Sequence, residues 1–243
     1  CTIRGVAARG ADRARGGVLY LDTNSSATLA GCSITNVSAM APRLGGQGGV
    51  SSVGRYSRLA LVSCAVSEAW GSGLQYAGGG VMYLHADGDA TVTASNVSRA
   101  RAFNTDTHPH DRYVHGAVAC VNQGSSATFT GCVITDSGSS TIDGEVNGLF
   151  ETYGRSSLRV SNSLITNITS FTDRGASAGA LVWAGTTANA SFVNCVISNF
   201  YIESNSTTLR LRIRGGLVAF SSWSNPSIIT FTGCTVTNVT NYG

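Results

Sequence analysis

A nine-residue pattern recurs along this chain, and its recurrence constrains the fold more than any other feature. It is seen in LAGCSITNV, FTGCVITDS, FVNCVISNF and FTGCTVTNV. Aligned on its fourth letter, the pattern occurs eight times, at a position that we call the cysteine column: Cys1, Cys32, Cys64, Ser95, Cys132, Ser163, Cys195 and Cys234. The spacing ranges from 31 residues, between Cys1 and Cys32, to 39 residues, between Cys195 and Cys234. Repeats of this length are typical of solenoids and propellers.

Two further columns of the repeat are apolar in every copy. Two residues after the cysteine column stand Ile3, Ile34, Val66, Val97, Ile134, Ile165, Ile197 and Val236. Three residues before it stand Leu29, Leu61, Val92, Phe129, Val160, Phe192 and Phe231. Most copies also contain a glycine followed by small or aliphatic residues, as in GGVLYL and GGVMYL. Short β-branched and aromatic runs bounded by Gly, Ser and Asn predict about three short strands per copy.

These columns indicate how the copies pack. A copy of about thirty residues cannot bury its apolar side chains alone, whereas stacked copies place each apolar column on itself and form a continuous core. We therefore expect an all-β fold, a single-domain parallel β-helix solenoid of about eight rungs that spans residues 1–243. A β-propeller is the less favoured alternative, because propeller repeats usually contain about forty or more residues.

Two segments between copies are longer than the rest, residues 99–115 and 200–215, and loops of repeat proteins often carry function. The first contains NTDTHPHDRYVH, in which His108, His110 and His115 are weak candidates for metal ligands, since their spacing matches no strong motif. Short fragments, Asn104 to Asp106, His115 with Gly116, and Arg212 to Arg214, are similar to the polygalacturonase pattern. The paired carboxylates of a glycoside hydrolase are missing, so we expect neither an enzyme nor a cofactor.

Charge and hydropathy exclude two classes of partner. Sixteen basic residues, all of them arginine, against thirteen acidic ones give a net charge of only +3. A nucleic-acid-binding surface normally clusters more basic charge than this. The chain also contains no apolar run of about eighteen residues. We expect no nucleic-acid partner and no membrane span.

Asn-x-Ser/Thr sequons are frequent and predict N-glycosylation in a secreted protein. They occur at Asn24, Asn36, Asn96, Asn167, Asn189, Asn205 and Asn238. Three of them, Asn36, Asn167 and Asn238, occupy the same position of the repeat. An alternative role for that position is an asparagine ladder, in which stacked amides of Asn167, Asn199 and Asn238 bond to one another. Both roles are compatible at different rungs.

The cysteines allow two interpretations. Stacking makes Cys1, Cys32 and Cys64 neighbours, and likewise Cys195 and Cys234. The rung spacing of about 4.8 Å is compatible with the Cα separation of a disulfide, and a ladder of buried free thiols is the equal alternative. Cys120 lies outside the column, and a disulfide with Cys132 within one rung is a further candidate.

The glycine openings, together with FTGC, FVNC and LAGC, resemble the repeats of chlamydial polymorphic outer-membrane proteins and related right-handed, pectin-lyase-like β-helices. The resemblance implies a secreted, surface-exposed protein of adhesion or structure. We expect an extracellular, glycosylated building block of a filament or surface coat, paired end to end with copies of itself or with the rest of a longer chain. The alternatives are an adhesin or carbohydrate-binding module and, less favoured, a polysaccharide lyase or hydrolase. A carbohydrate partner would be contacted by outward aromatic residues: Trp70, Tyr76, Trp183, Tyr201 and Trp223.

Overall fold

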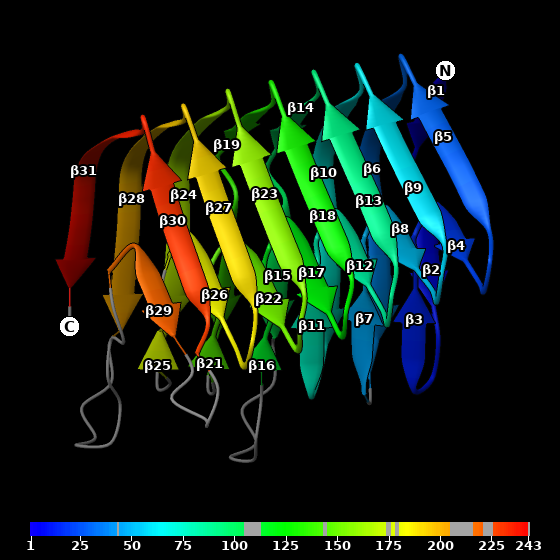
Figure 1. The fold of residues 1–243 in the computed structure, drawn as a ribbon. Helices are drawn as coiled ribbons and strands as arrows, with labels where there is room; N and C mark the ends of the chain where they lie inside the picture. The colour runs from blue at the N-terminus through cyan, green and yellow to red at the C-terminus, as the bar shows by residue number, and fades with distance from the viewer. Residues whose placement is uncertain are drawn as a thin grey trace.

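The fold is a parallel β-solenoid, as the repeats predict. The computed structural model describes residues 1–42, 44–104, 113–142, 145–173, 176–177, 180–204, 216–220 and 226–242. Strands alone, joined by turns, make up these residues, and every strand pairs in parallel with the equivalent strand of the next turn (Figure 1). No helix that could cross a membrane occurs in the part of the chain described.

Four sheets run the length of the stack, and we name them A to D. Sheet A contains β1 (Thr2–Arg4), β2 (Ala7–Arg9), β6 (Ser33–Ala41), β10 (Ala65–Gly73), β14 (Asn96–Ser98), β15 (Arg101–Asn104), β19 (Val133–Thr135), β20 (Gly138–Thr141), β24 (Leu164–Thr172), β28 (Val196–Ser204) and β31 (Thr235–Tyr242). Sheet B contains β3 (Arg13–Arg15), β7 (Gly45–Gln47), β11 (Tyr76–Gly78), β16 (Tyr113–Val114), β21 (Glu145–Val146) and β25 (Ala176–Ser177).

Sheets C and D complete each turn. Sheet C contains β4 (Leu19–Leu21), β8 (Ser51–Val53), β12 (Met82–Leu84), β17 (Ala119–Asn122), β22 (Phe150–Tyr153), β26 (Val182–Ala184) and β29 (Val218–Phe220). Sheet D contains β5 (Ser26–Ala30), β9 (Arg58–Val62), β13 (Asp89–Thr93), β18 (Ser126–Thr130), β23 (Ser157–Ser161), β27 (Asn189–Val193) and β30 (Ile228–Thr232).

Two details of the expected solenoid are corrected. The structure contains about six complete turns rather than eight, because the eighth copy contributes only β31 and the seventh has no strand in sheet B among the described residues. Each turn has four strands rather than three. The additional strand, in sheet B, is only two or three residues long and contains glycine in β7 and β11, so its strand signal is weak.

The apolar columns pair in register through the stack. Ile34 lies between Ile3 and Val66 in sheet A, and the aligned column of sheet D contains Phe129, Phe192 and Phe231. Phenylalanine rings add contacts along the core: the Phe192 ring centroid lies 5.0 Å from that of Phe231. Stacking identical positions therefore buries a continuous core, as the repeats predict.

Sharp bends in the backbone turn the chain from one sheet to the next. The residue before the cysteine column has a positive φ in seven copies, and so does one residue in the middle of the sheet A segment. This second position is occupied by Asn36, Glu68, Arg99, Asp136, Asn167, Asn199 and Asn238, at φ between 50° and 56°. Asparagine and aspartate tolerate this left-handed conformation better than most residues, which explains their frequency here.

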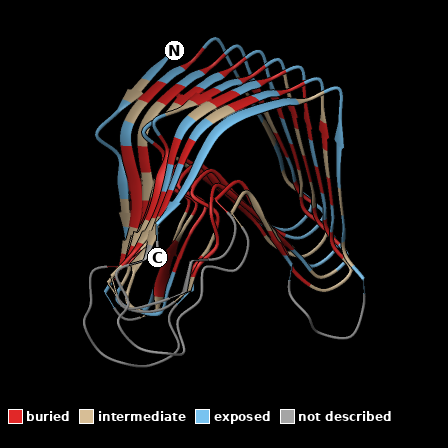
Figure 2. Ribbon diagram, turned by 90° about the vertical axis from the view of Figure 1, so that its left-hand side faces the viewer, coloured by how far each residue is buried: buried red, intermediate tan, exposed pale blue. Residues whose placement is uncertain are grey.

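Each turn is bent in outline rather than round (Figure 2). Sheet D and sheet A form its outer sides, and sheets B and C form its inner sides, which meet at the glycine-rich segment between them. We call the residues beside this junction that alternate with the apolar core positions the inner corner, whether or not they are exposed. They are Arg15, Gln47, Gly78, His115 and Asn147 from the sheet B side, and Tyr20, Ser52, Tyr83, Cys120, Glu151 and Trp183 from sheet C.

Candidate functional site

The sequon asparagines lie on the surface of the solenoid. The side chains of Asn24, Asn36, Asn96, Asn167, Asn189 and Asn238 are exposed, and Asn205 lies outside the described residues. Exposure is the structural requirement that an attached glycan imposes on the folded chain. Glycosylation itself stays a prediction.

The expected asparagine ladder is present. The Asn238 Nδ2 donates to Asn199 Oδ1 at 3.0 Å, and the Asn199 Nδ2 donates to Asn167 Oδ1 at 3.2 Å. The ladder continues to Asp136, whose carboxylate accepts from Asn167 Nδ2 at 3.1 Å. At Asn167 and Asn238 the ladder therefore uses the same nitrogen that a glycan would modify.

The cysteine column combines one disulfide with free thiols. Cys1 and Cys32 are disulfide-bonded, with their Cα atoms 4.5 Å apart, whereas Cys64, Cys195 and Cys234 are free. Each of these free thiols donates to a carbonyl of the preceding turn; for Cys64 the acceptor is Leu29, at 3.2 Å.

Serine replaces cysteine in two copies of this column for a physical reason. The Ser95 Oγ accepts the backbone N–H of Cys64 at 3.0 Å, and the Ser163 Oγ accepts that of Cys132 at 3.1 Å. A thiol and a hydroxyl both have one hydrogen to donate and lone pairs to accept. The column is thus a line of hydrogen-bonding side chains that links successive turns.

The candidate disulfide between Cys120 and Cys132 is not formed, and both residues are free thiols. Cys132 belongs to the cysteine column, and its Sγ donates to the Val92 carbonyl at 3.3 Å. Cys120 lies instead on β17 in sheet C, at the inner corner. Position in the turn separates the two thiols, because one precedes sheet D and the other follows it.

Most of the loop candidates lie outside the described residues. This applies to His108, His110, Trp223 and the segment 205–215. His115 is described, and it follows β16 directly. Of the expected outward aromatics, Tyr76 and Tyr201 are exposed, and Trp70 and Trp183 are half-buried.

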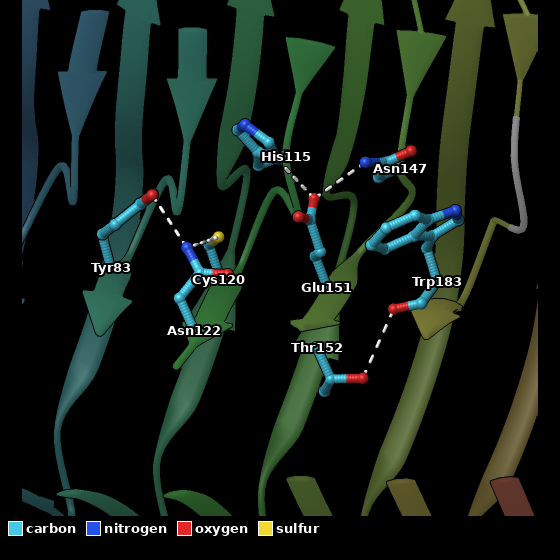
Figure 3. Close-up of polar contacts among 8 residues, drawn as sticks. All are labelled: Tyr83, His115, Cys120, Asn122, Asn147, Glu151, Thr152 and Trp183. Carbon is cyan, nitrogen blue, oxygen red and sulfur yellow. Dashed lines mark hydrogen bonds and ion pairs between the residues drawn. The ribbon is translucent and has the colours of Figure 1, made fainter. Parts of the chain in front are cut away.

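His115 belongs to a cluster of buried polar side chains at the inner corner (Figure 3). Its Nδ1 lies 2.6 Å from the Oε2 of Glu151, which also accepts from the Asn147 Nδ2 at 2.9 Å. Cys120 lies on the strand between Tyr83 and Glu151 in the register of sheet C. The ligand atoms of His115, Cys120 and Glu151 all lie within 4.8 Å of one another.

The cluster is almost inaccessible to water. The exposed fraction is 0% for Cys120, 3% for Glu151 and 2% for Asn147. Burying a carboxylate is costly unless charge and hydrogen bonds compensate it. Glu151 has such compensation from the His115 ring and the Asn147 amide.

The environment shifts the proton affinities of these groups. Burial lowers the pKa of His115, but the Glu151 charge, the hydrogen bond to it and the Glu145 charge outweigh burial, so that this pKa is raised overall. Burial, followed by the Glu151 charge, holds the pKa of the Cys120 thiol well above its ordinary value. Cys120 is therefore a neutral thiol around neutral pH rather than a reactive thiolate.

Aromatic rings surround the cluster. The rings of Tyr76 and Tyr113 are both stacked with the His115 ring, at centroid distances of 6.1 Å and 6.2 Å. Tyr83 packs over Gly78, where a β-carbon would lie only 3.2 Å from the ring. The Tyr83 hydroxyl accepts from the Asn122 Nδ2 at 2.8 Å, and the same nitrogen lies 3.4 Å from the Cys120 Sγ.

Unpaired polar atoms are concentrated at or beside the inner corner. Buried side-chain atoms without a hydrogen-bond partner include Arg15 Nε, Gln47 Oε1, Ser52 Oγ, His85 Nε2 and Asn147 Oδ1. Buried polar groups are normally paired, with protein, water or a ligand. This side of the solenoid is therefore the part of the described surface best suited to a polar ligand or an ion.

The sequence identified two residues of this cluster: His115 as a weak candidate for a metal ligand, and Cys120 as a candidate for a disulfide with Cys132. It did not identify Glu151 or Asn147. The signal was the alignment of the copies on sheet C, where Glu151 stands in the column that elsewhere holds Tyr20, Tyr83 or Trp183. An acid in a column of aromatic and small residues marks a departure from the repeat.

Fold and site together define a parallel β-solenoid with a stacked apolar core, an asparagine ladder and one buried polar cluster. No family model, curated protein or solved structure matches the chain.

Proposed function

We propose that the chain is a secreted, N-glycosylated structural β-solenoid, a building block of an extracellular filament or surface coat. The observation that carries the proposal is the last described turn. Phe231 and Val236 are 38% and 41% exposed, whereas the same columns one turn earlier, at Phe192 and Ile197, are fully buried. A further turn, from a second copy or from more of the same chain, would bury these side chains and pair the free edge of β31.

Assembly is tested with the purified chain by sedimentation over a range of concentrations and by electron microscopy. We expect elongated particles that lengthen with concentration, and we expect Phe231→Asp to abolish the lengthening. Tyr56→Ser is the control, because Tyr56 is exposed on a bend away from the last turn, and this variant should lengthen like the unmodified chain. Particles of one length at every concentration would contradict self-assembly.

The glycan part of the proposal rests on the exposed sequons. Mass spectrometry of the protein from its native source should find glycans at Asn24, Asn96 and Asn189, which are exposed and do not belong to the ladder of Asn167, Asn199 and Asn238. We expect lower occupancy at Asn167 and Asn238, whose amide nitrogens donate within the ladder. A native protein without any glycan would contradict the proposed secreted glycoprotein.

Carbohydrate binding by a surface adhesin is a second candidate, favoured by the aromatic residues of sheet B. Tyr76 and Tyr113 are exposed and adjacent in register, and exposed aromatic faces of this kind stack on sugars. Binding to a glycan array should fall when both are changed to Ala, with Tyr56→Ala as the matched control. Unchanged binding in the double variant would contradict this candidate.

Kinship with the chlamydial repeat proteins is proposed from the FTGC and FVNC copies alone. The proposal assigns no catalytic activity, and depolymerisation of polygalacturonate or a related acidic polysaccharide by the purified chain would contradict it.

A further inference from the structure

We propose that His115, Cys120 and Glu151 bind a divalent transition-metal ion of the zinc class at the inner corner. The inference is independent of the proposed structural role. Its basis is the convergence of three different ligand types, from two neighbouring turns of the stack, on one buried point (Figure 3).

The donor set fits such an ion in type, and its ligand atoms lie close enough for a small rearrangement to bring them around one ion. Zinc takes thiolate, imidazole and carboxylate ligands at about 2.0–2.3 Å, so that tetrahedral donors lie roughly 3.3–3.8 Å apart. The three ligand atoms here lie within 4.8 Å of one another. Binding requires the His115 Nδ1 and Glu151 Oε2, now 2.6 Å apart, to separate by about 1 Å, because the ion replaces their shared proton.

Charge balance also favours a divalent ion. A thiolate from Cys120, a carboxylate from Glu151 and a neutral His115 ring carry two negative charges in total, which one divalent cation neutralises. The metal displaces one proton from the thiol and one from the hydrogen-bonded His115–Glu151 pair. The site is therefore neutral with protons and neutral with metal, as burial demands.

Outer partners that hold the ligands are in place. The Asn147 Oδ1 is buried without a hydrogen-bond partner, while its Nδ2 bonds to Glu151. In Figure 3 this oxygen points away from Glu151, so Asn147 holds the carboxylate through its Nδ2, and we expect a water molecule to complete the coordination of the ion. Asn122, bonded to both Cys120 and the Tyr83 hydroxyl, orients the sulfur, as outer partners commonly orient metal ligands.

The alternative use of the same residues is a cysteine nucleophile oriented by His115 and Glu151. The observations favour the metal, because Cys120 is 0% exposed and a nucleophile must be reached by its substrate. Alkylation by iodoacetamide distinguishes the two. A nucleophile is modified rapidly in the folded chain, whereas a buried metal ligand is protected, and more strongly with metal than without.

The test is titration of the full chain with Co²⁺ after removal of metals by a chelator. We expect one equivalent to bind with the thiolate-to-cobalt charge-transfer absorption of a Cys ligand, and Zn²⁺ to displace it. Cys120→Ser should abolish the absorption and weaken binding by more than about 100-fold, beyond the 10- to 100-fold loss typical of an outer partner. Glu151→Gln should weaken binding and keep the absorption.

Cys132→Ser is the matched control, since Cys132 is also a buried free thiol and serine occupies its column in two other copies. This variant should bind Co²⁺ like the unmodified chain. Absence of stoichiometric binding, or absorption that persists in Cys120→Ser, would overturn the proposal. Circular dichroism of each variant shows whether it is folded. If Cys120→Ser fails to fold, Glu151→Gln and His115→Gln carry the same test through affinity.

Discussion

Substitution of Asn199 separates two effects of the bend in sheet A on stability: the hydrogen bonds of the asparagine ladder and the strain of the left-handed backbone. Asn199 adopts φ 56°, donates to Asn167 and accepts from Asn238, and it is not part of a sequon. Removing the side chain loses the two ladder hydrogen bonds and a longer one from the Asn199 Nδ2 to the Thr166 Oγ1 at 3.3 Å. At this exposed site the three together are worth about 1 kcal/mol. An alanine held in the left-handed region costs about 1–2 kcal/mol more, whereas glycine avoids that strain but costs up to about 1 kcal/mol in chain entropy.

The free energy of unfolding should therefore fall by about 2–3 kcal/mol in Asn199→Ala and by about 1–2 kcal/mol in Asn199→Gly. Urea denaturation of the unglycosylated chain measures both values, provided that the slope with denaturant is unchanged. Asn96→Ala is the control, because Asn96 is exposed on β14 without a positive φ, and it should change stability by less than about 0.5 kcal/mol. Equal losses for alanine and glycine would refute the strain argument, and no loss in either would refute the ladder.

Three further predictions concern the core, the cysteine column and pH. Phe192→Ala should destabilise the chain by about 3–5 kcal/mol in urea denaturation, and exposed Phe220→Ala by less than about 1 kcal/mol; similar losses would contradict the stacked core. Cys132→Ser should lower the stability of the chain less than Cys132→Ala, because alanine leaves the backbone N–H of Ser95 in the preceding turn unpaired, at a cost of about 1–3 kcal/mol. The reverse order in thermal unfolding would refute this role of the cysteine column. Burial, and then the charges of Arg15 and Arg13, lower the pKa of His85 to about 4. As the pH falls from 6.5 to 4, the unfolded chain therefore binds a proton at His85 that the folded chain does not, and the free energy of unfolding should fall by up to about 3 kcal/mol. A pH profile of His85→Gln that matches the unmodified chain would contradict this.

The sequence predicts the solenoid well because each apolar column is repeated. Eight copies of the Ile or Val column and seven of the Leu, Val or Phe column give the same signal many times, and stacking aligns them. The number of complete turns was overestimated, since a copy counted from one column does not require all four strands. Sheet B was missed because strands such as Gly45–Gln47 lack the β-branched residues that identify a strand.

The site was poorly predicted for the opposite reason. The repeat pattern is defined by residue types that many copies share, so a residue that occurs only once in its column, such as Glu151, does not contribute to the pattern. The histidines of the 99–115 segment were metal candidates because three of them occur in one short segment. Of these, His115 is the one that the structure describes, and it lies close to a thiol and a carboxylate. Its partners come from residues 120, 147 and 151, which the register of sheets B and C brings together. Spacing in one copy does not reveal a site that spans two copies.

The single acid of this column also bears on whether the cluster is structural. Other turns fill the equivalent position with tyrosine, serine or tryptophan, so the fold does not require a charge there. Replacing a buried ion pair by apolar residues of similar volume is often neutral or stabilising, whereas removing one partner costs about 3–5 kcal/mol. The double variant His115→Leu, Glu151→Leu should thus unfold at nearly the urea concentration of the unmodified metal-free chain, while Glu151→Leu alone should be much less stable. It should also bind no Co²⁺. A double variant as unstable as the single one would instead make the pair a structural element, and the argument for a ligand would then depend on Cys120 and the unpaired oxygen of Asn147.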